Sequence, residues 1–198
     1  MEGDVRALCD KGDHDAAATL ALRGYGSEVL GFLMGVNASE TDASDAFAEL
    51  SEVVWRKLPA FTWEATLRTW IYGIARNVSR TLRRDAGRRR KREAPAPSSA
   101  FEAVAVAVRT ETLTYLRTSK RTRFQEIRDQ LPEEDRALLI LRIDRKLEWN
   151  ELARVLAENE GEALDAAAVT REAARLRKRF QLVKDRLREM AKRAGIAV

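Results

Sequence analysis

The sequence is poor in the residues that build most catalytic and metal centres. Its 198 residues include one cysteine, Cys9, and one histidine, His14. A single cysteine excludes an internal disulfide and a cysteine-rich zinc site, and a single histidine removes most histidine-dependent chemistry. A glycine-rich phosphate loop and a nucleophile elbow are also missing. We therefore predict no catalytic residues, no metal, no cofactor and no enzyme activity.

Long apolar runs are missing as well. The stretch 103–108 is apolar but only six residues long, whereas a helix that crosses a bilayer needs about 20. The first residues are acidic and lack the basic start and apolar run of a signal peptide. We therefore expect a cytoplasmic protein with no membrane insertion.

Strand signals are weak throughout the chain. Asn-Gly and Asp-Gly pairs, which favour hairpins, do not occur, and the apolar residues recur at helical spacing. These features predict an all-α fold. The charge run 85–93 and the Pro/Ser-rich stretch 94–99 are typical of a flexible linker. We predict two small helical domains at 1–84 and 128–198, joined by a linker at 85–127.

The net charge of +5 conceals a segregation of charge along the chain. Residues 1–60 carry 5 basic and 11 acidic side chains, whereas residues 61–93 carry 10 basic and 3 acidic ones. A second basic block of 10 basic and 4 acidic side chains follows at 165–198. Two separate basic blocks predict two contacts with a polyanion. The acidic first third predicts a surface that meets a basic protein partner or repels the wrong ligand.

The acidic stretch 42–58 has the pattern of a helix that ends before Pro59. Asp45, Glu49 and Glu52 follow one another at steps of four and three residues, so they share one exposed face. Simple solubility is the alternative explanation of these charges.

Residues 61–84 have the pattern of a short loop that leads into an amphipathic helix. Arginines hold phosphates, asparagine reads base edges, and an exposed aromatic ring stacks on an unpaired base. The candidates for nucleic-acid contact in this stretch are Thr62, Trp63, Arg76, Asn77, Arg80, Arg83 and Arg84. A Trp63 ring in the core and an Asn77 that is merely solvated are the alternatives.

The C-terminal part has the pattern of a short helix at 148–156 and a long basic helix from about Asp165 to Lys192. Two helices joined by a turn, with the second one basic, are typical of a helix-turn-helix that binds duplex DNA. The candidates for contact with bases and phosphates are Arg175, Arg177, Lys178, Arg179, Gln181 and Lys184. A helix that only packs on its own domain is the alternative.

Both parts resemble the sigma-70 family, in particular the two-domain extracytoplasmic function (ECF) sigma factors. Residues 42–49 resemble the segment that binds the clamp helices of the RNA polymerase β′ subunit. Residues 58–61 and 67–77 resemble the segment that opens the promoter and captures a flipped base of the minus-ten element. Residues 131–142 resemble the start of the second domain, and residues 147–156 resemble the first helix of its helix-turn-helix. Residues 176–188 resemble the recognition helix that reads the minus-thirty-five element.

The chain departs from the family pattern at several points. Ala48 replaces a usual glutamine, Ser51 replaces an aromatic residue, and Thr62-Trp63 replaces a common Arg-Gly pair. The turn between Leu156 and Leu176 is about a dozen residues longer than in the family, which leaves the register of the base-reading residues open.

The resemblance implies a sigma factor that binds core RNA polymerase and directs promoter-specific initiation. Its implied partners are the β′ clamp helices and the β flap of core polymerase, promoter DNA, and an anti-sigma factor. In this hypothesis Asp45, Glu49 and Glu52 bind core polymerase. The alternative hypothesis is a stand-alone helix-turn-helix regulator whose N-terminal half serves dimerisation or sensing.

Overall fold

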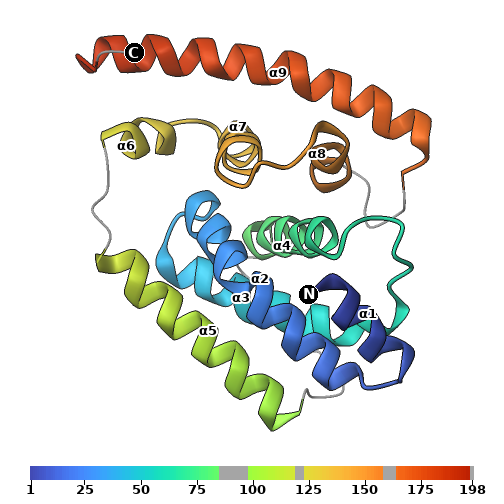
Figure 1. Ribbon diagram of the computed structural model, residues 1–198. Helices are drawn as coiled ribbons and strands as arrows, with labels where there is room; N and C mark the ends of the chain where they lie inside the picture. The colour runs from blue at the N-terminus through green and yellow to red at the C-terminus, as the bar shows by residue number, and fades with distance from the viewer. Residues whose placement is uncertain (85–97, 119–122, 158–163, 197–198) are drawn as a thin grey trace. The chain divides into compact units, whose positions relative to one another are not determined.

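The computed structural model describes residues 1–84, 98–118, 123–157 and 164–196, and it is helical with no strand among these residues. The all-α prediction is therefore confirmed. The chain divides into two compact units, Met1–Arg117 and Thr118–Val198 (Figure 1). Within the described segments, no helix combines the length and the apolar character that a membrane span requires.

The first unit consists of α1 (Glu2–Asp10), α2 (His14–Val36), α3 (Glu40–Lys57), the 3₁₀ turn η1 (Leu58–Ala60), α4 (Leu67–Arg84) and α5 (Ser99–Thr118). Its core lies between α2, α3 and α4, where each helix buries an apolar stripe. The rings of Phe32 on α2 and Tyr72 on α4 meet edge to face, with centroids 5.5 Å apart. This geometry suits the quadrupoles of two buried rings.

Side-chain caps and one buried polar pair define the ends of these helices. Asp13 caps α2 by accepting a hydrogen bond from the Ala16 amide. Ser39 caps α3 by accepting one from the Asp42 amide at 3.0 Å. Near the end of α2, Asn37 accepts a 2.8 Å hydrogen bond from the Ser79 hydroxyl of α4, and both side chains are buried. This bond satisfies two polar groups and fixes α4 against α2.

Helix α5 occupies part of the stretch for which we predict a linker. Its Phe101 and Leu113 are buried, and a Cβ added at Gly26 of α2 would lie 2.8 Å from Val108 Cγ1. Just before α5, Ser98 hydrogen-bonds to Asp15 at the start of α2. The contact between Ser98 and Asp15 lies at the start of both helices, and the contact between Val108 and Gly26 lies further along both. Helix α5 therefore runs parallel to α2. The linker prediction is thus wrong for residues 99–118, which form a helix of the first unit; its residues 85–97 and 119–122 lie outside the described residues.

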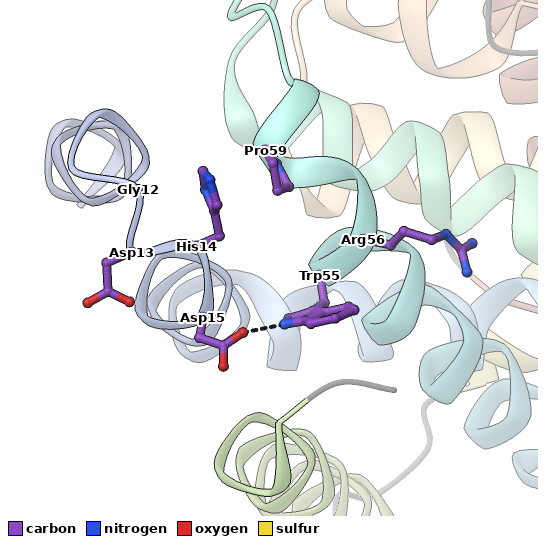
Figure 2. A pocket seen from close by; sticks show the side chains of 7 residues that line it. All are labelled: Gly12, Asp13, His14, Asp15, Trp55, Arg56 and Pro59. Carbon is purple, nitrogen blue, oxygen red and sulfur yellow. Dashed lines mark hydrogen bonds between the residues drawn. The ribbon is translucent and has the colours of Figure 1, made fainter. Parts of the chain in front are cut away.

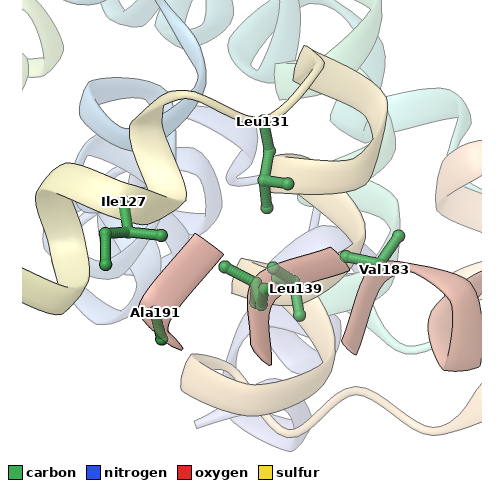
Figure 3. Packing of buried hydrophobic residues seen from close by; sticks show 6 residues of the cluster. Ile127, Leu131, Leu139, Val183 and Ala191 are labelled. Atoms are coloured by element: carbon green, nitrogen blue, oxygen red, sulfur yellow. The ribbon is translucent and has the colours of Figure 1, made fainter. Parts of the chain in front are cut away.

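The second unit consists of α6 (Arg123–Asp129), α7 (Glu133–Leu139), the π-helical turn η2 (Ile140–Asp144), α8 (Trp149–Leu156) and α9 (Ala166–Arg193). One side of α9 packs on the shorter helices. Figure 3 shows part of this packing, in which Val183 and Ala191 of α9 lie with Ile127, Leu131 and Leu139. The apolar period of α9 places these contacts on one face, so its other residues stay at the surface.

The starts of α8 and α9 agree closely with the sequence pattern. Glu148 and Glu151 form a reciprocal capping box at α8, with the Glu148 amide 2.8 Å from Glu151 Oε2. Asp165, where the sequence pattern begins the long helix, caps α9 by accepting a 2.6 Å hydrogen bond from the Ala168 amide. Helix α9 therefore extends ten residues before Leu176. The lengthened turn becomes largely helix, although residues 158–163 lie outside the described residues.

Candidate nucleic-acid interface

An aromatic cluster forms at the loop before α4. Phe61 stacks on Trp70, with centroids 4.7 Å apart and planes at 28°, and it contacts Trp63 at 4.8 Å with planes at 50°. The loop joins α4 through Thr66, whose hydroxyl accepts a hydrogen bond from the Thr69 amide at 3.1 Å. Trp63 is half-buried and Thr62 is exposed. The ring of Trp63 thus belongs to a cluster at the rim of the first unit rather than to its core.

The backbone of Trp63 lies in the left-handed region, with φ of 61°. A bulky side chain there costs on the order of 1–3 kcal/mol unless its surroundings compensate. The sigma-70 pattern has a glycine here, and a glycine adopts positive φ without strain. Trp63 keeps the geometry of a glycine position, and its contact with Phe61 offsets part of the strain.

The predicted contacts on α4 divide into exposed and buried side chains. Asn77, Arg83 and Arg84 are exposed and Arg80 is half-buried. Arg83 Nε donates to the Ser79 carbonyl at 3.1 Å, which directs its guanidinium along the end of the helix. These side chains leave positive charge on the surface of α4.

Arg76 differs from its prediction. Its side chain is only 5% exposed, so it does not form part of the exposed arginine surface that we expected. The buried side of α4 is wider than the apolar stripe of an amphipathic helix, because α4 also buries Thr69, Tyr72 and Ser79. Helices pack around α4 over a wide arc, and that arc includes Arg76.

A separate acidic face lies on α3. Asp45, Glu49 and Glu52 are all exposed, as their spacing predicts, and they point away from the stripe of Phe47, Leu50 and Val54 that α3 buries in the core. The face can accept basic side chains of a partner without disturbing the core.

On α9 the predicted residues differ in their surroundings. Lys178 and Gln181 are exposed. Arg175 is paired with Glu172 through two hydrogen bonds of 2.8 and 2.7 Å. The Lys184 ammonium lies 5.2 Å from the centroid of the Phe180 ring. Arg177 is exposed, and its guanidinium carbon lies 5.5 Å from the centroid of the Trp149 ring on α8.

Arg179 is committed to contacts within the protein. Its Nε donates to Asp135 Oδ1 and its Nη1 donates to Glu134 Oε2, both at 2.7 Å. Although burial lowers the pKa of Arg179, these hydrogen bonds raise it overall, so the guanidinium stays charged. The position favours a role in joining α9 to α7 over the predicted contact with DNA.

Two sets of contacts between arginines and tryptophan rings could not be predicted from the sequence. Trp149 lies between two arginines, since Arg142 is 4.9 Å from its centroid in addition to Arg177. In the first unit, the Arg6 guanidinium carbon lies 5.6 Å from the centroid of the Trp63 ring. Both join residues that do not share a helix, and helical periodicity reports only on neighbours within one helix.

A hollow of about 530 Å³ lies elsewhere on the first unit, between the start of α2 and the end of α3 (Figure 2). Across it, Trp55 Nε1 donates a 2.6 Å hydrogen bond to Asp15 Oδ1. This bond, with a second from Ser98, lowers the pKa of Asp15. No residue that lines the hollow is among the predicted contacts. Among the residues that the structure describes, no group of His, Cys, Asp and Glu could hold a metal ion.

Comparison with known protein families finds a match, and it lies in the first unit. Residues 22–89 match the family Sigma-70 region 2. The matched stretch holds most of α2, all of α3, the aromatic loop and α4, and it begins after α1. No curated protein matches the chain.

Proposed function

Because the chain belongs to the sigma-70 family through its region 2, we propose that it is a sigma factor of the ECF group. A sigma-70 region 2 supports roles in promoter recognition and in binding RNA polymerase, and sigma-70 factors are non-enzymatic. The proposal adds that this chain directs initiation at specific promoters through both of its units. The observation that carries it is the stretch 61–84, where an aromatic loop and a helix with exposed Asn77, Arg83 and Arg84 lie within the matched residues.

The first unit opens the minus-ten element in this proposal. Melting duplex DNA costs about 1.4 kcal/mol per stacked step, and stacking one base on an aromatic ring returns about 1–3 kcal/mol. Trp63 supplies the ring, because its backbone holds it at the rim of the unit beside Phe61. Asn77 reads the captured base, while Arg80, Arg83 and Arg84 hold the backbone of the single strand. Thr62 is exposed beside Trp63 and contacts the same strand.

The acidic face of α3 binds core polymerase in this proposal. Asp45, Glu49 and Glu52 project from a helix whose opposite side is fixed in the core. Such a rigid acidic face suits a basic partner surface, and the resemblance assigns residues 42–49 to contact with the β′ clamp helices.

The second unit binds the minus-thirty-five element. Helices α8 and α9 form the helix-turn-helix, with α9 as the recognition helix. Lys178 and Gln181 are exposed on α9 and provide contacts to bases or phosphates. Arg175, Arg177 and Lys184 reach DNA only after exchanging their present partners, which are Glu172, Trp149 and Phe180. The β flap of polymerase is the protein partner of this unit, and an anti-sigma factor restrains the whole chain.

Co-purification with core RNA polymerase tests the proposal. Asp45→Arg combined with Glu49→Arg reverses the charge of the α3 face, while both side chains are exposed and the fold is retained. We expect the double variant to lose binding to core polymerase and the wild-type chain to bind. Arg23→Glu serves as the control, because Arg23 is an exposed residue of α2 outside the acidic face. Equal binding by all three chains would reject this use of α3, and a wild-type chain that binds duplex DNA but not polymerase would support the stand-alone regulator.

A further inference from the structure

Helix α1 contacts the aromatic loop although it lies outside the matched stretch. Glu2 and Arg6 are four residues apart, so they share one face of α1. Glu2 reaches the start of α4, and Arg6 lies over the ring of Trp63 at 5.6 Å. Two side chains of one helix thus meet the two ends of the loop that precedes α4.

The Glu2 contact anchors α1 firmly. Its Oε1 accepts hydrogen bonds from the Tyr25 hydroxyl at 2.9 Å and from the Arg68 amide at 3.2 Å. The Arg68 amide is among the first of α4, which lack a partner within the helix. Burial, together with the hydrogen bond to Glu2, raises the pKa of Tyr25, so the phenol remains a donor. Arg68 also pairs with Glu28 of α2 at 2.7 Å, which ties the same corner to a third helix.

The basic side chain of α1 lies beside the aromatic loop. Arg6 is the one basic residue in the sequence of α1, among three acidic ones. Glu2 is held by its two hydrogen bonds, whereas Arg6 is exposed and contributes a cation beside Trp63. A nucleotide whose base stacks on the aromatic cluster brings its phosphate to within a few ångströms of the ring, where a guanidinium binds it well.

We propose that α1 forms part of the surface for single-stranded DNA, with Arg6 contacting the phosphate of the nucleotide captured at Trp63 and Glu2 positioning Arg6 and the loop. This inference rests on the proposed function, because it requires base capture at the loop. It extends the interface beyond the region 2 match to residues 2–6. Arg6 leaves the Trp63 ring for the phosphate when the base arrives, exchanging one exposed cation–aromatic contact for a charged hydrogen bond.

The test measures binding of the full chain to a fluorescent single-stranded DNA of randomised sequence over a range of salt concentrations. Each phosphate contact to a single strand contributes about 0.7 to the slope of log affinity against log salt. At 0.1 M salt, one such contact therefore strengthens binding about fivefold. We expect Arg6→Ala to weaken binding by about this factor and to lower the slope by about 0.7. Lys11→Ala removes the same charge at the end of α1 and should leave the slope unchanged.

A second measurement separates stacking from charge. The chain has four tryptophans, and the part of the fluorescence quenching by DNA that disappears in Trp63→Phe belongs to Trp63. We expect Arg6→Ala to need more DNA for the same Trp63 quenching. Equal slopes for Arg6→Ala and Lys11→Ala, or tighter binding by Arg6→Ala, would overturn the inference while leaving polymerase binding intact. Absence of any Trp63 quenching in the wild-type chain would overturn both the inference and the proposed base capture, and failure of the wild-type chain to bind core polymerase would contradict the proposed function itself.

Discussion

Replacing Asp135 by asparagine tests how α9 is held in the second unit. Asp135 is 6% exposed and accepts hydrogen bonds from Arg179 Nε at 2.7 Å and Arg186 Nη1 at 3.1 Å. It is therefore the carboxylate on α7 through which two arginines of α9 are joined to the shorter helices. The substitution Asp135→Asn keeps the size of the side chain and removes its negative charge.

The expected loss of stability depends on how exposed the two arginines are that pair with Asp135. A hydrogen bond to a charged group contributes about 1.5–3 kcal/mol, and breaking a fully buried ion pair costs about 3–5 kcal/mol. Arg179 is 29% exposed and Arg186 is 55% exposed, so water replaces part of the lost interaction. We estimate that Asp135→Asn destabilises the second unit by about 2 kcal/mol, which corresponds to about 30-fold faster opening.

Hydrogen exchange followed by mass spectrometry measures this effect in the second unit alone. Amides of residues 133–139 and 176–187 should exchange about 30-fold faster in Asp135→Asn, while amides of the first unit keep their rates. Glu134→Gln is the matched control, because Glu134 is 44% exposed and its ion pair with Arg179 lies nearer to solvent; we expect an effect below about 1 kcal/mol. Equal exchange in the two variants would refute the assignment of Asp135 as the joint between α7 and α9.

Three further predictions, the first with a control substitution, test a helix cap and the packing by denaturation and proteolysis. Ser39→Ala should destabilise the first unit by about 1 kcal/mol through loss of the α3 cap, whereas Thr41→Ala at an exposed position should change stability by less than about 0.5 kcal/mol in urea unfolding. Gly26→Ala should cost about 1–3 kcal/mol and increase cleavage within residues 99–118, because its Cβ would crowd Val108 at 2.8 Å; an unchanged cleavage rate would contradict the docking of α5. Leu139→Ala should cost about 2–5 kcal/mol in the second unit, because Leu139 is buried in the cluster under α9; a loss under about 1 kcal/mol would mean that this cluster is not tightly packed.

The boundaries of α3, α4, α8 and α9 could be predicted from the sequence to within a few residues. Apolar residues at helical spacing, Pro59 after α3 and Asp165 before α9 are local signals, and each corresponds to a helix end within a few residues. Helix α5 was assigned to the linker because the stretch before it is rich in charge, proline and serine. What holds α5 in place is contact with α2 across more than eighty residues, and no local pattern reports such a contact.

In the candidate site, too, some features could be predicted from local spacing and others could not. The exposure of Asp45, Glu49 and Glu52 follows from spacing within one helix. The burial of Arg76 and the ion pairs of Arg179 depend on which neighbouring helices approach. The left-handed backbone of Trp63 could not be predicted from the tryptophan itself; only the glycine that the family pattern has at this position is consistent with it.

Run-off transcription with purified core RNA polymerase on a library of genomic fragments tests the central claim most directly. If the chain is a sigma factor, its addition will produce discrete transcripts that core polymerase alone does not make. Asp45→Arg combined with Glu49→Arg will abolish these transcripts. A pattern of transcripts that is the same with and without the wild-type chain would contradict the account.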